Sequence, residues 1–499
     1  MNWHEGWHRL RTWAGNHVAL IGLSVVVVAW ALGLQRLGHS WGDDFTLYIR
    51  QSKSLIDGNV GQVIADNHFN VDNAAKPGFS PYVYPWSFPI LLAPFYRLFG
   101  LDYARLKLVE IACLVAFLWG FLAVIRSRMQ HWVAVATVVS IGTTLSYVEH
   151  TDHLLSELPY MAAVTVTLWY LDRLRRNQVL DAAGRNQLVL LGVLAMCVFN
   201  FRREGLAIVA AIVVAQLFDL RGRWRLVSWR QVFTPVLAFA GSVLLVQFLL
   251  PSALAPEYDE SGLHQTWLKL QGPFRRAFAT QLGFDNLGGV ALLAVFLLVV
   301  AGVLVRMWRA ASRDAPLLVF AVGSMTIVGM IPANDKRYLL AITPFAVYFA
   351  AQALAAVPLP RKAGHWLATA VLALLTVAHL TELPSTVRAA HEANASGQPE
   401  GPAAEYVQDA FAAIRRYTHQ DDVVSFFKVR TLTLYTDRRG VQSDDLEIVR
   451  QRADYIMLLK HSNQGQPLVG EADADAMHWQ AVWQDDDWVL YRLPLYESS

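Results

Sequence analysis

Charged residues are scarce in this sequence. They make up 16% of its 499 residues, whereas soluble globular chains average about 25%. Hydrophobic residues account for 55% of the chain, and 17 tryptophans are among them. This composition argues against a soluble protein and predicts that much of the chain lies in a lipid bilayer.

The sequence also lacks the features of several other protein classes. Its net charge is only +2 and its basic residues form no stripe, which argues against a nucleic acid as partner. The two cysteines, Cys113 and Cys197, both lie inside apolar runs, so we expect no disulfide framework and no cysteine-based metal site. A P-loop and a glycine-rich nucleotide fingerprint are absent, which agrees with an activity that needs no nucleotide.

Long apolar runs are abundant instead. A membrane-spanning helix needs about 20 mostly apolar residues. No small-residue cleavage site follows the first run, so we expect a retained span and not a cleaved signal peptide. The run 86–100 is short and broken by proline, which favours an interfacial or re-entrant helix, with a twelfth span as the alternative. Eleven runs qualify as spans, at 17–35, 104–125, 132–148, 154–172, 187–201, 204–219, 231–250, 287–305, 315–332, 338–357 and 365–382.

The arginines give an orientation. If the N-terminus is cytoplasmic, every inside loop is basic, as the positive-inside rule requires. An odd number of spans then leaves the C-terminus outside. Arginine far outnumbers lysine, which is typical of GC-rich bacterial genomes. The sequence therefore predicts a multi-pass protein of the bacterial inner (cytoplasmic) membrane, with a cytoplasmic N-terminus and a periplasmic C-terminal domain. The basic loops lie at 126–128, 173–185, 221–230, 306–313 and 361–362.

The character of the chain changes after residue 383. A polar linker, 384–400, precedes a segment of helical period at 403–420 and three strand-like segments, "DVVSFF", "ADYIMLLK" and "WQAVW...DWVLYRL", the last of which fits a hairpin. The predicted fold is mostly α. It is a polytopic membrane domain, 1–383, of about 11 (11–13) transmembrane helices with a first extracytoplasmic loop at 36–103. A small extracytoplasmic α/β domain, 401–499, follows it.

Several charged residues lie at the outer ends of the predicted spans, where the positive-inside rule does not explain them. Ionisable groups at a membrane edge tend to face a cavity or one another, because exposure to hydrocarbon is costly. We therefore expect a shared polar cavity at the outer interface. The residues come from four loops: Asp43, Asp44, Glu149, Asp152, Glu157, Arg202, Arg203, Glu204, Asp335, Lys336 and Arg337.

Both signs of charge in this set have a chemical use. Arginine forks hold phosphate oxygens bidentately and lysine adds a point charge, so the pairs Arg202–Arg203 and Lys336–Arg337 suit a lipid-linked phosphate. A carboxylate beside that phosphate can remove a proton from an attacking hydroxyl. The combination predicts transfer of a phosphate-linked group to an acceptor alcohol.

Five segments, in order along residues 1–380, resemble the polytopic GT-C glycosyltransferases, which include the protein O-mannosyltransferases and the bacterial aminoarabinose lipid A transferases. "WGDDFTLYIR" and "YPWSFPILLAPFYRLFG" are similar to the acidic pair and the "YP...P" element of that family. "LLSELPYMAAV" is similar to its second acidic corner. The other two segments are "FRREGLAI" and "KRYLLAITP".

The resemblance implies an inverting enzyme with a polyprenyl-phosphate sugar donor and an acidic base in the first outer loop. Asp43 matches the leading Asp of the acidic pair and is the expected base, while Asp44 stands where Glu is more usual and would orient the acceptor or hold a metal. The acceptor would be a glycolipid, a protein or a polysaccharide. The expected substrate-binding residues are Tyr84, Glu157, Arg202, Arg203, Lys336, Arg337 and Tyr338.

A divalent metal is a further expectation. His153 precedes Glu157 by four residues, so on one helix the two side chains would lie on the same face as candidate ligands for a divalent cation.

Other readings remain open for the same residues. Asp43 and Asp44 could cap a helix that begins at "FTLYIRQSKSL". Arg202 and Arg203 could extend toward lipid headgroups, and Tyr84 could belong to an aromatic belt. For the whole protein, the alternatives are a lipid-diphosphate-dependent polysaccharide ligase or polymerase, and a membrane transporter.

Overall fold

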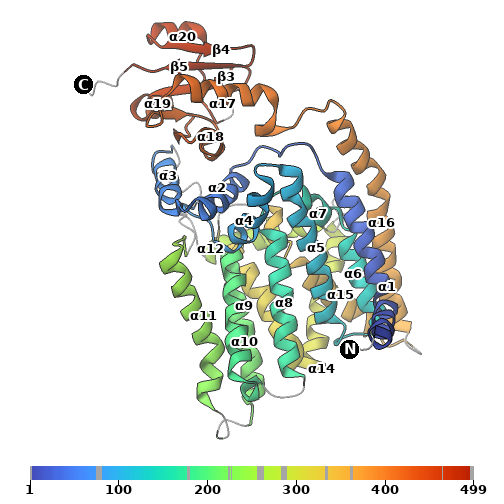
Figure 1. Ribbon diagram of the computed structural model, residues 1–499. Coiled ribbons are helices and arrows are strands. Elements are labelled where there is room, and N and C mark those ends of the chain that lie inside the picture. Colours follow the sequence, from blue (N-terminus) through green and yellow to red (C-terminus); the bar gives the residue numbers. More distant parts are fainter. Residues whose placement is uncertain are drawn as a thin grey trace.

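The structure of the protein is a computed structural model. It describes residues 3–74, 81–176, 180–222, 225, 228–254, 263–281, 289–331, 335–359, 363–462 and 465–494. Figure 1 shows a bundle of long helices with a separate small domain at one of its ends. We call this end of the bundle the domain end, and the other the opposite end.

The bundle contains every apolar run that the sequence predicts to be a span. Its helices are α1 (Trp3–Leu34), α5 (Tyr103–Ile125), α6 (His131–Gly142), α7 (Leu145–Glu149), α8 (Glu157–Arg175), α9 (Arg185–Phe201), α10 (Leu206–Leu220), α11 (Trp229–Leu249), α14 (Gly289–Gly329), α15 (Thr343–Ala355) and α16 (Ala363–Asn394). Short 3-10 turns join several of them: η1 (His150–Asp152), η2 (Leu180–Ala182), η3 (Arg203–Gly205) and η4 (Lys336–Leu339). Two short helices, α12 (Leu263–Gln271) and α13 (Pro273–Gln281), lie between α11 and α14.

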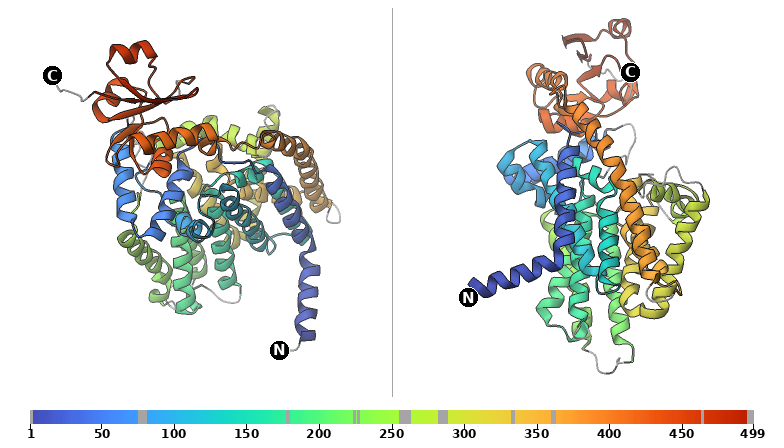
Figure 2. Two further views of the ribbon diagram at one scale, coloured as in Figure 1. Left: turned by 45° about the horizontal axis from the view of Figure 1, so that its top comes forward. Right: turned by 90° about the vertical axis from the view of Figure 1, so that its right-hand side faces the viewer.

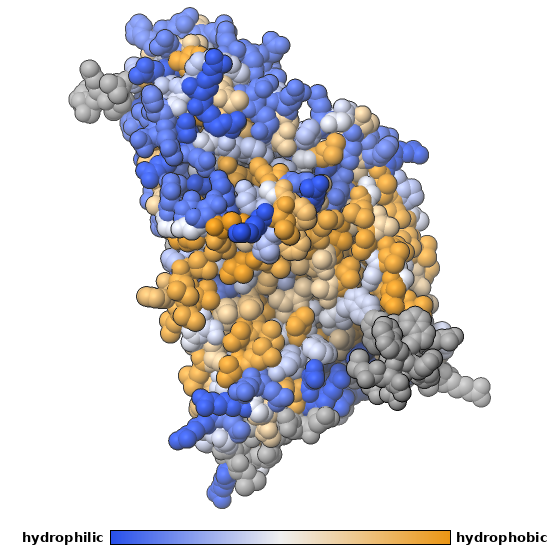
Figure 3. Space-filling model, viewed as in Figure 1, coloured by the Kyte–Doolittle hydropathy of each residue, from blue (hydrophilic) through white to orange (hydrophobic). Residues whose placement is uncertain are grey.

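The surface of the bundle carries an apolar belt. In Figure 3 hydrophobic residues cover the middle of the face in view, and hydrophilic residues cover the C-terminal domain and much of the opposite end. Four helices in the described part of the chain are long and apolar enough to cross a membrane: 103–125, 229–249, 292–329 and 363–394. These are the features of a multi-pass membrane protein.

The predicted number of eleven spans is not confirmed. Several predicted spans form helices that are too short to meet the same criterion, such as α9 with 17 residues, α10 with 15 and α15 with 13. Others are bent. The predicted span 132–148 is broken between α6 and α7 by 58°, and the predicted spans 287–305 and 315–332 lie on α14, on either side of a kink at Ala310.

Close helix contacts hold the bundle together. A Cβ atom on Gly302 of α14 would lie 1.8 Å from the carbonyl oxygen of Phe349 on α15, and one on Gly192 of α9 would lie 2.3 Å from that of Pro235 on α11. Only glycine allows such an approach, which is the usual way in which membrane helices maximise their packing. These contacts explain why the runs around the two glycines pack as pairs of helices.

An ion-pair network closes the opposite end of the bundle. Arg128, which follows α5, donates to Asp314 at 2.9 Å and to Asp172 at 2.8 Å. Arg306 also pairs with Asp314. Arg128 and Asp314 are almost fully buried, with side chains 2% and 0% exposed. The network joins the ends of α5 and α8 to the kinked middle of α14.

The first loop of the chain folds into three helices at the domain end: α2 (Asp44–Asp57), α3 (Val60–Asp72) and α4 (Ser87–Phe99). Gly58 takes a left-handed backbone conformation with φ 74°, so the chain turns sharply from α2 to α3 at a residue without a side chain. The apolar run 86–100 corresponds to α4, a short apolar helix, as the sequence indicates.

The C-terminal domain is a five-stranded mixed sheet with helices. Its strands are β1 (Val423–Ser425), β2 (Arg439–Val441), β3 (Tyr455–Leu459), β4 (Gln480–Gln484) and β5 (Trp488–Arg492), in the order β2-β1-β3-β5-β4. β4 and β5 form the predicted antiparallel hairpin, and β1 is parallel to β2 and β3. The helices are α17 (Glu405–Tyr417), α18 (Val429–Thr436), α19 (Leu446–Arg452) and α20 (Glu471–Ala476), after the turn η5 (Gly401–Ala403).

The predicted linker is partly wrong, because α16 continues as a helix through Asn394. Its apolar run ends earlier, but helical hydrogen bonding continues along the following polar residues. Asn394 also bonds back to the end of α1, accepting from the backbone of Leu37 at 2.9 Å. Figure 2 shows α16 leading from the bundle to the C-terminal domain.

Hydrogen bonds dock the C-terminal domain on the first loop. Arg439 donates to Asp66 of α3 at 3.0 Å, and Asn70 of α3 donates to Thr433 of α18 at 3.1 Å. The hydroxyls of Tyr103 and Tyr435 lie 2.7 Å apart. Buried polar groups are thus paired across the junction, which fixes α18 over α2 and α3.

Candidate active site

The two aspartates of "WGDD" stand at the beginning of α2. Asp43 is the N-cap residue and Asp44 is the first residue of the helix, but the carboxylate of Asp43 makes no capping hydrogen bond. Capping therefore does not account for Asp43. Adjacent residues at a helix start point in different directions, and the two side chains indeed meet different partners.

Asp44 is held by a tyrosine and an arginine. The hydroxyl of Tyr84 donates to one carboxylate oxygen at 2.6 Å, and Arg337 of η4 donates to the other at 2.8 Å. Burial by itself favours the protonated acid, but Arg337 and the Tyr84 hydroxyl outweigh it and hold the pKa of Asp44 below its usual value. Asp44 is therefore a fixed, ionised carboxylate.

Asp43 has a different environment. Its side chain is 12% exposed, and the ammonium of Lys428 lies 3.9 Å from one carboxylate oxygen. Its other oxygen, Oδ1, is buried and accepts no hydrogen bond from any described residue. Burial raises the pKa of Asp43 above its ordinary value, against the opposing effect of Lys428 and Arg430. The carboxylate keeps an unused acceptor position and a raised proton affinity.

Glu157, at the start of α8, lies between two arginines. Arg202 is 2.7 Å from its carboxylate and Arg337 is 3.6 Å away. Both guanidinium groups also lie over the ring of Tyr338, 5.3 and 5.4 Å from its centroid. Arg337 thus joins the acidic loop at Asp44 to the second acidic corner at Glu157.

Each arginine has a further carboxylate partner. Arg337 pairs with Asp335 at 2.9 Å, and Arg202 pairs with Glu204. Nearby carboxylates raise the pKa of both arginines despite burial, so both stay charged. A buried cluster of this kind presents two fixed cations that an incoming phosphate can share.

The structure thus brings most of the predicted site residues into one cluster, and we call it the acidic-arginine cluster: Asp44, Tyr84, Glu157, Arg202, Arg337 and Tyr338. Asp43 precedes Asp44 in the chain and stands at the edge of this cluster, beside Lys428.

Two predicted residues are placed elsewhere. Arg203 turns to the loop after α11, where it donates to the carbonyl of Ala253 and the hydroxyl of Ser252, each at 2.7 Å. Its neighbour Arg202 occupies the cluster instead, because adjacent residues in a turn point apart. Lys336 is exposed, and its backbone carbonyl accepts a hydrogen bond from Gln281.

The helical spacing proposed for a metal site is wrong. Helix α8 begins only at Glu157, and His153 lies before it in extended conformation, with φ −120° and ψ 137°. The ring of His153 is 3.4 Å from the hydroxyl of Ser40, whereas Glu157 pairs with arginine. Within the described residues, no group of three or more His, Cys, Asp or Glu could hold a metal ion.

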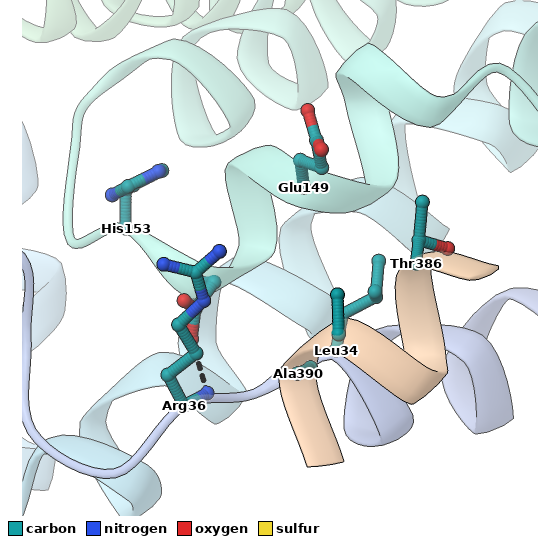
Figure 4. Close-up of a pocket in the computed structure, with 8 residues that line it drawn as sticks. Leu34, Arg36, Glu149, His153, Thr386 and Ala390 are labelled. Atoms are coloured by element: carbon teal, nitrogen blue, oxygen red, sulfur yellow. Dashed lines mark hydrogen bonds between the residues drawn. The ribbon is translucent and has the colours of Figure 1, made fainter. Parts of the chain in front are cut away.

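A cavity of about 260 Å³ lies between the end of α1, the α7–η1 corner and α16. In Figure 4, Arg36 and His153 stand on one side of it, and Leu34, Thr386 and Ala390 on the other. The backbone of Arg36 donates to Asp152 at 3.0 Å. Glu149, Asp152 and His153 were expected near the site, and they line this neighbouring cavity.

Two cations of the site come from the C-terminal domain and were not predicted. Lys428 faces Asp43, and Arg430 donates to the hydroxyl of Tyr84 at 3.3 Å. In the sequence both stand in "FFKVRTL", where nothing separates them from ordinary surface cations. Tyr48 was also missed; its hydroxyl donates to Ser156, next to Glu157, at 3.0 Å.

Comparison with known proteins adds to this geometry. The sequence matches no protein-family model and no curated protein significantly. The structure is similar to that of ArnT from Cupriavidus metallidurans bound to undecaprenyl phosphate, with a TM-score of 0.58 at 12% identity over 96% of this chain and 98% of that one. It is also similar to the oligosaccharyltransferase AglB from Archaeoglobus fulgidus in complex with an inhibitory peptide and a dolichol-phosphate. That TM-score is 0.51 at 11% identity, over 89% of this chain and 70% of that one.

Both proteins are glycosyltransferases of the GT-C fold. The resemblance that the sequence segments indicate is therefore confirmed at the level of the fold. At these identities the similarity establishes the arrangement of the chain and leaves its reaction to be argued from the site.

Proposed function

We propose that the protein is an inverting glycosyltransferase that moves a sugar from a polyprenyl-phosphate donor to an acceptor hydroxyl. The observation that carries the proposal is the buried Oδ1 of Asp43, which accepts no hydrogen bond within the described part of the chain and stands at the edge of a cluster that contains two charged arginines. A base with a free acceptor position and a cationic site for the leaving group are the two parts that this reaction needs.

In the proposed reaction the acceptor hydroxyl attacks the anomeric carbon from the face opposite the phosphate. The new carbon–oxygen bond forms as the bond between the anomeric carbon and the phosphate oxygen breaks. Asp43 takes the proton of the hydroxyl, and the leaving polyprenyl phosphate takes the electron pair. The configuration at the anomeric carbon inverts.

Arg337 and Arg202 would stabilise the phosphate as its charge grows. Their planar forks suit two phosphate oxygens at once. Asp44 and Glu157 would hold the forks in position before the donor arrives, so little reorganisation is needed during the reaction. The lipid phosphates bound to ArnT and AglB support a donor of this class.

We further propose that the cluster faces the extracytoplasmic side of the bacterial inner membrane. The basic loops predicted to be cytoplasmic include residues 126–128 and 306–313, which lie at the opposite end of the bundle, around the network of Arg128 and Asp314. The cluster and the C-terminal domain lie at the domain end. This distribution of arginine agrees with the positive-inside rule.

The test is the Asp43→Asn variant, with Asp57→Asn as its control. Removing a general base lowers the rate by about 100-fold or more. We expect Asp43→Asn to lose sugar transfer from a synthetic polyprenyl-phosphate sugar, while Asp57→Asn, an exposed residue at the end of the same helix, keeps it. Transfer at the wild-type rate by Asp43→Asn would overturn the proposed role.

The same transfer assay separates the alternatives. A ligase or polymerase would use a lipid-diphosphate donor and not the monophosphate, and a transporter would move substrate with no new glycosidic bond. Mass spectrometry of envelope glycolipids, glycoproteins and polysaccharides, from cells with and without the protein, would identify the acceptor class. The acceptor is the molecule that lacks one sugar in the cells without the protein.

A further inference from the structure

The beginning of α18 lies directly along the "WGDD" segment. The ring of Phe427 packs against Trp41 with centroids 4.8 Å apart, and Lys428 is 3.9 Å from Asp43. Thr431 donates to the carbonyl oxygen of Gly42 at 3.5 Å. Three consecutive positions of the first loop therefore each contact a residue of the C-terminal domain.

Arg430 fixes this contact. Its side chain is almost fully buried, with 1% of the residue exposed. It donates to Asn67 at 3.1 Å, to the carbonyl of Pro81 at 2.8 Å and to the hydroxyl of Tyr84 at 3.3 Å. Such a fully bonded arginine holds the backbone of α18 in one place. Lys428, two residues earlier, is consequently held beside Asp43.

Lys428 differs from Arg430 because its side chain is partly exposed to solvent. Its side chain is 31% exposed and stands at the N-cap of α18, where its carbonyl accepts from Leu432 at 3.0 Å. The charged groups that act on Asp43 are Lys428 and Arg430 from the C-terminal domain and Asp44 from α2. Arg430 and Asp44 each have bonded partners of their own, whereas the ammonium of Lys428 is aimed at Asp43.

We propose that Lys428 is a positioning residue that keeps the carboxylate of Asp43 ionised, so that the C-terminal domain completes the catalytic site. This inference rests on the proposed function, in which Asp43 accepts the proton of the acceptor hydroxyl. Without the lysine, a carboxylate that is buried and next to Asp44 would take up a proton more readily. The base would then be blocked at a pH where the wild-type enzyme is active.

The experiment compares Lys428→Gln, Lys428→Arg and Lys53→Gln. Lys53 of α2 is a matched control, because it also pairs across the domain junction, with Asp437, and also at 3.9 Å, but away from Asp43. Two readouts are measured against pH in proteoliposomes. One is kcat/KM for sugar transfer, and the other is the labelling of Asp43 by a water-soluble carbodiimide, read by mass spectrometry.

We expect the acidic limb of kcat/KM to move up by about one pH unit in Lys428→Gln, since an opposite charge at this distance shifts a carboxylate by at least that much. Burial already sets the pKa of Asp43 above its ordinary value, so losing the cation raises it further. The carboxyl oxygen adds to the central carbon of the carbodiimide as a nitrogen of the reagent takes up the acid proton, so labelling requires the protonated acid. The labelling midpoint of Asp43 should therefore move up by the same amount. Lys428→Arg should restore both, and Lys53→Gln should change neither.

Three results would overturn the inference. The first is that neither the acidic limb of the kcat/KM profile nor the labelling midpoint of Asp43 shifts in Lys428→Gln. The second is a rise in KM for the donor with an unshifted limb, which would make Lys428 a phosphate ligand. The third is an Asp43 that resists the reagent at every pH, because an acceptor must be able to reach the base. If the labelling midpoint shifts in Lys428→Gln but the wild-type protein transfers no sugar, the coupling between Lys428 and Asp43 is upheld and the proposed function is refuted.

Discussion

At the scale of single residues, the structure gives two neighbouring aspartates opposite settings. Asp44 is bonded by Tyr84 and Arg337, and it stays ionised. Asp43 is buried with Lys428 beside one carboxylate oxygen, and its other oxygen accepts no hydrogen bond from any residue that the structure describes. These two environments are the physical argument for the proposed roles, with Asp43 as the base and Asp44 as the supporting acid.

Arg337 is the residue on which the cluster depends most, because it pairs with Asp44, Glu157 and Asp335 at once. We predict that Arg337→Lys keeps the charge but loses the planar fork, and that kcat/KM for transfer falls by about 10–100-fold with a higher KM for the donor. Steady-state kinetics with varied donor concentration would measure both.

Lys336 provides the contrast for this prediction. It is the adjacent cation and is exposed, so Lys336→Gln should leave kcat/KM within about twofold, as is usual for surface substitutions. Equal losses in the two variants would mean that net charge at this corner matters and that the geometry of the fork does not.

The sequence predicted which loops meet, but it could not predict which of two adjacent charged residues would enter the cluster. In Arg202–Arg203 and Lys336–Arg337 one member enters the cluster and the other turns away. The choice follows from the exact path of η3 and η4, which composition and spacing do not determine. The same holds for His153, whose helical spacing to Glu157 disappears because α8 begins later than expected.

At the scale of helices and strands, the apolar runs predicted the positions of the bundle helices well and their lengths poorly. Each of the eleven runs lies on a helix, and the hairpin of β4 and β5 was readable from its alternation. The bend between α6 and α7 was not, because a single glycine such as Gly142, ahead of Thr143 and Thr144, is common within membrane-spanning helices and does not by itself signal a break. The two threonine hydroxyls bond back to the carbonyls of Val139 and Ser140 at 2.9 Å each, which offers the backbone an alternative to a straight helix.

The network at the opposite end of the bundle gives a prediction at this scale. Arg128→Met leaves Asp172 and Asp314 without their shared cation, and loss of one partner from a buried ion pair costs about 3–5 kcal/mol. We expect a lower apparent Tm in detergent, measured by differential scanning fluorimetry.

Arg126→Met is the matched control for this prediction, because Arg126 is exposed and lies in the same turn. Its apparent Tm should stay close to that of the wild type. A drop of the same size in both variants would mean that the buried network contributes nothing of its own.

At the scale of the whole molecule, the C-terminal domain is bound to the site and not merely tethered to it. Asp66 of α3 illustrates the junction, since it accepts from Arg50 at 3.1 Å on its own side and from Arg439 at 3.0 Å across it. The sequence predicted a separate soluble domain but could not predict this docking. Asp66 and Arg439 are several hundred residues apart, and neither belongs to one of the five segments that resemble the GT-C family.

We predict that Asp66→Asn loosens the junction, because Arg50 and Arg439 would share a neutral partner in place of a carboxylate. Hydrogen–deuterium exchange should become faster in α18 and α3 while the bundle helices stay protected. Asp72→Asn, an exposed position on the same helix, should leave exchange in α18 unchanged. Unchanged protection of α18 in Asp66→Asn would show that the remaining contacts suffice.

The docking of α18 also has a consequence for biosynthesis. Asp43 leaves the ribosome early, whereas Lys428 and Arg430 emerge only several hundred residues later and must then fold against the first loop. A nascent or prematurely terminated chain can therefore insert its helices while its acidic pair still lacks these two cations. The first loop can therefore reach its docked form only after the C-terminal domain has been translated and has folded.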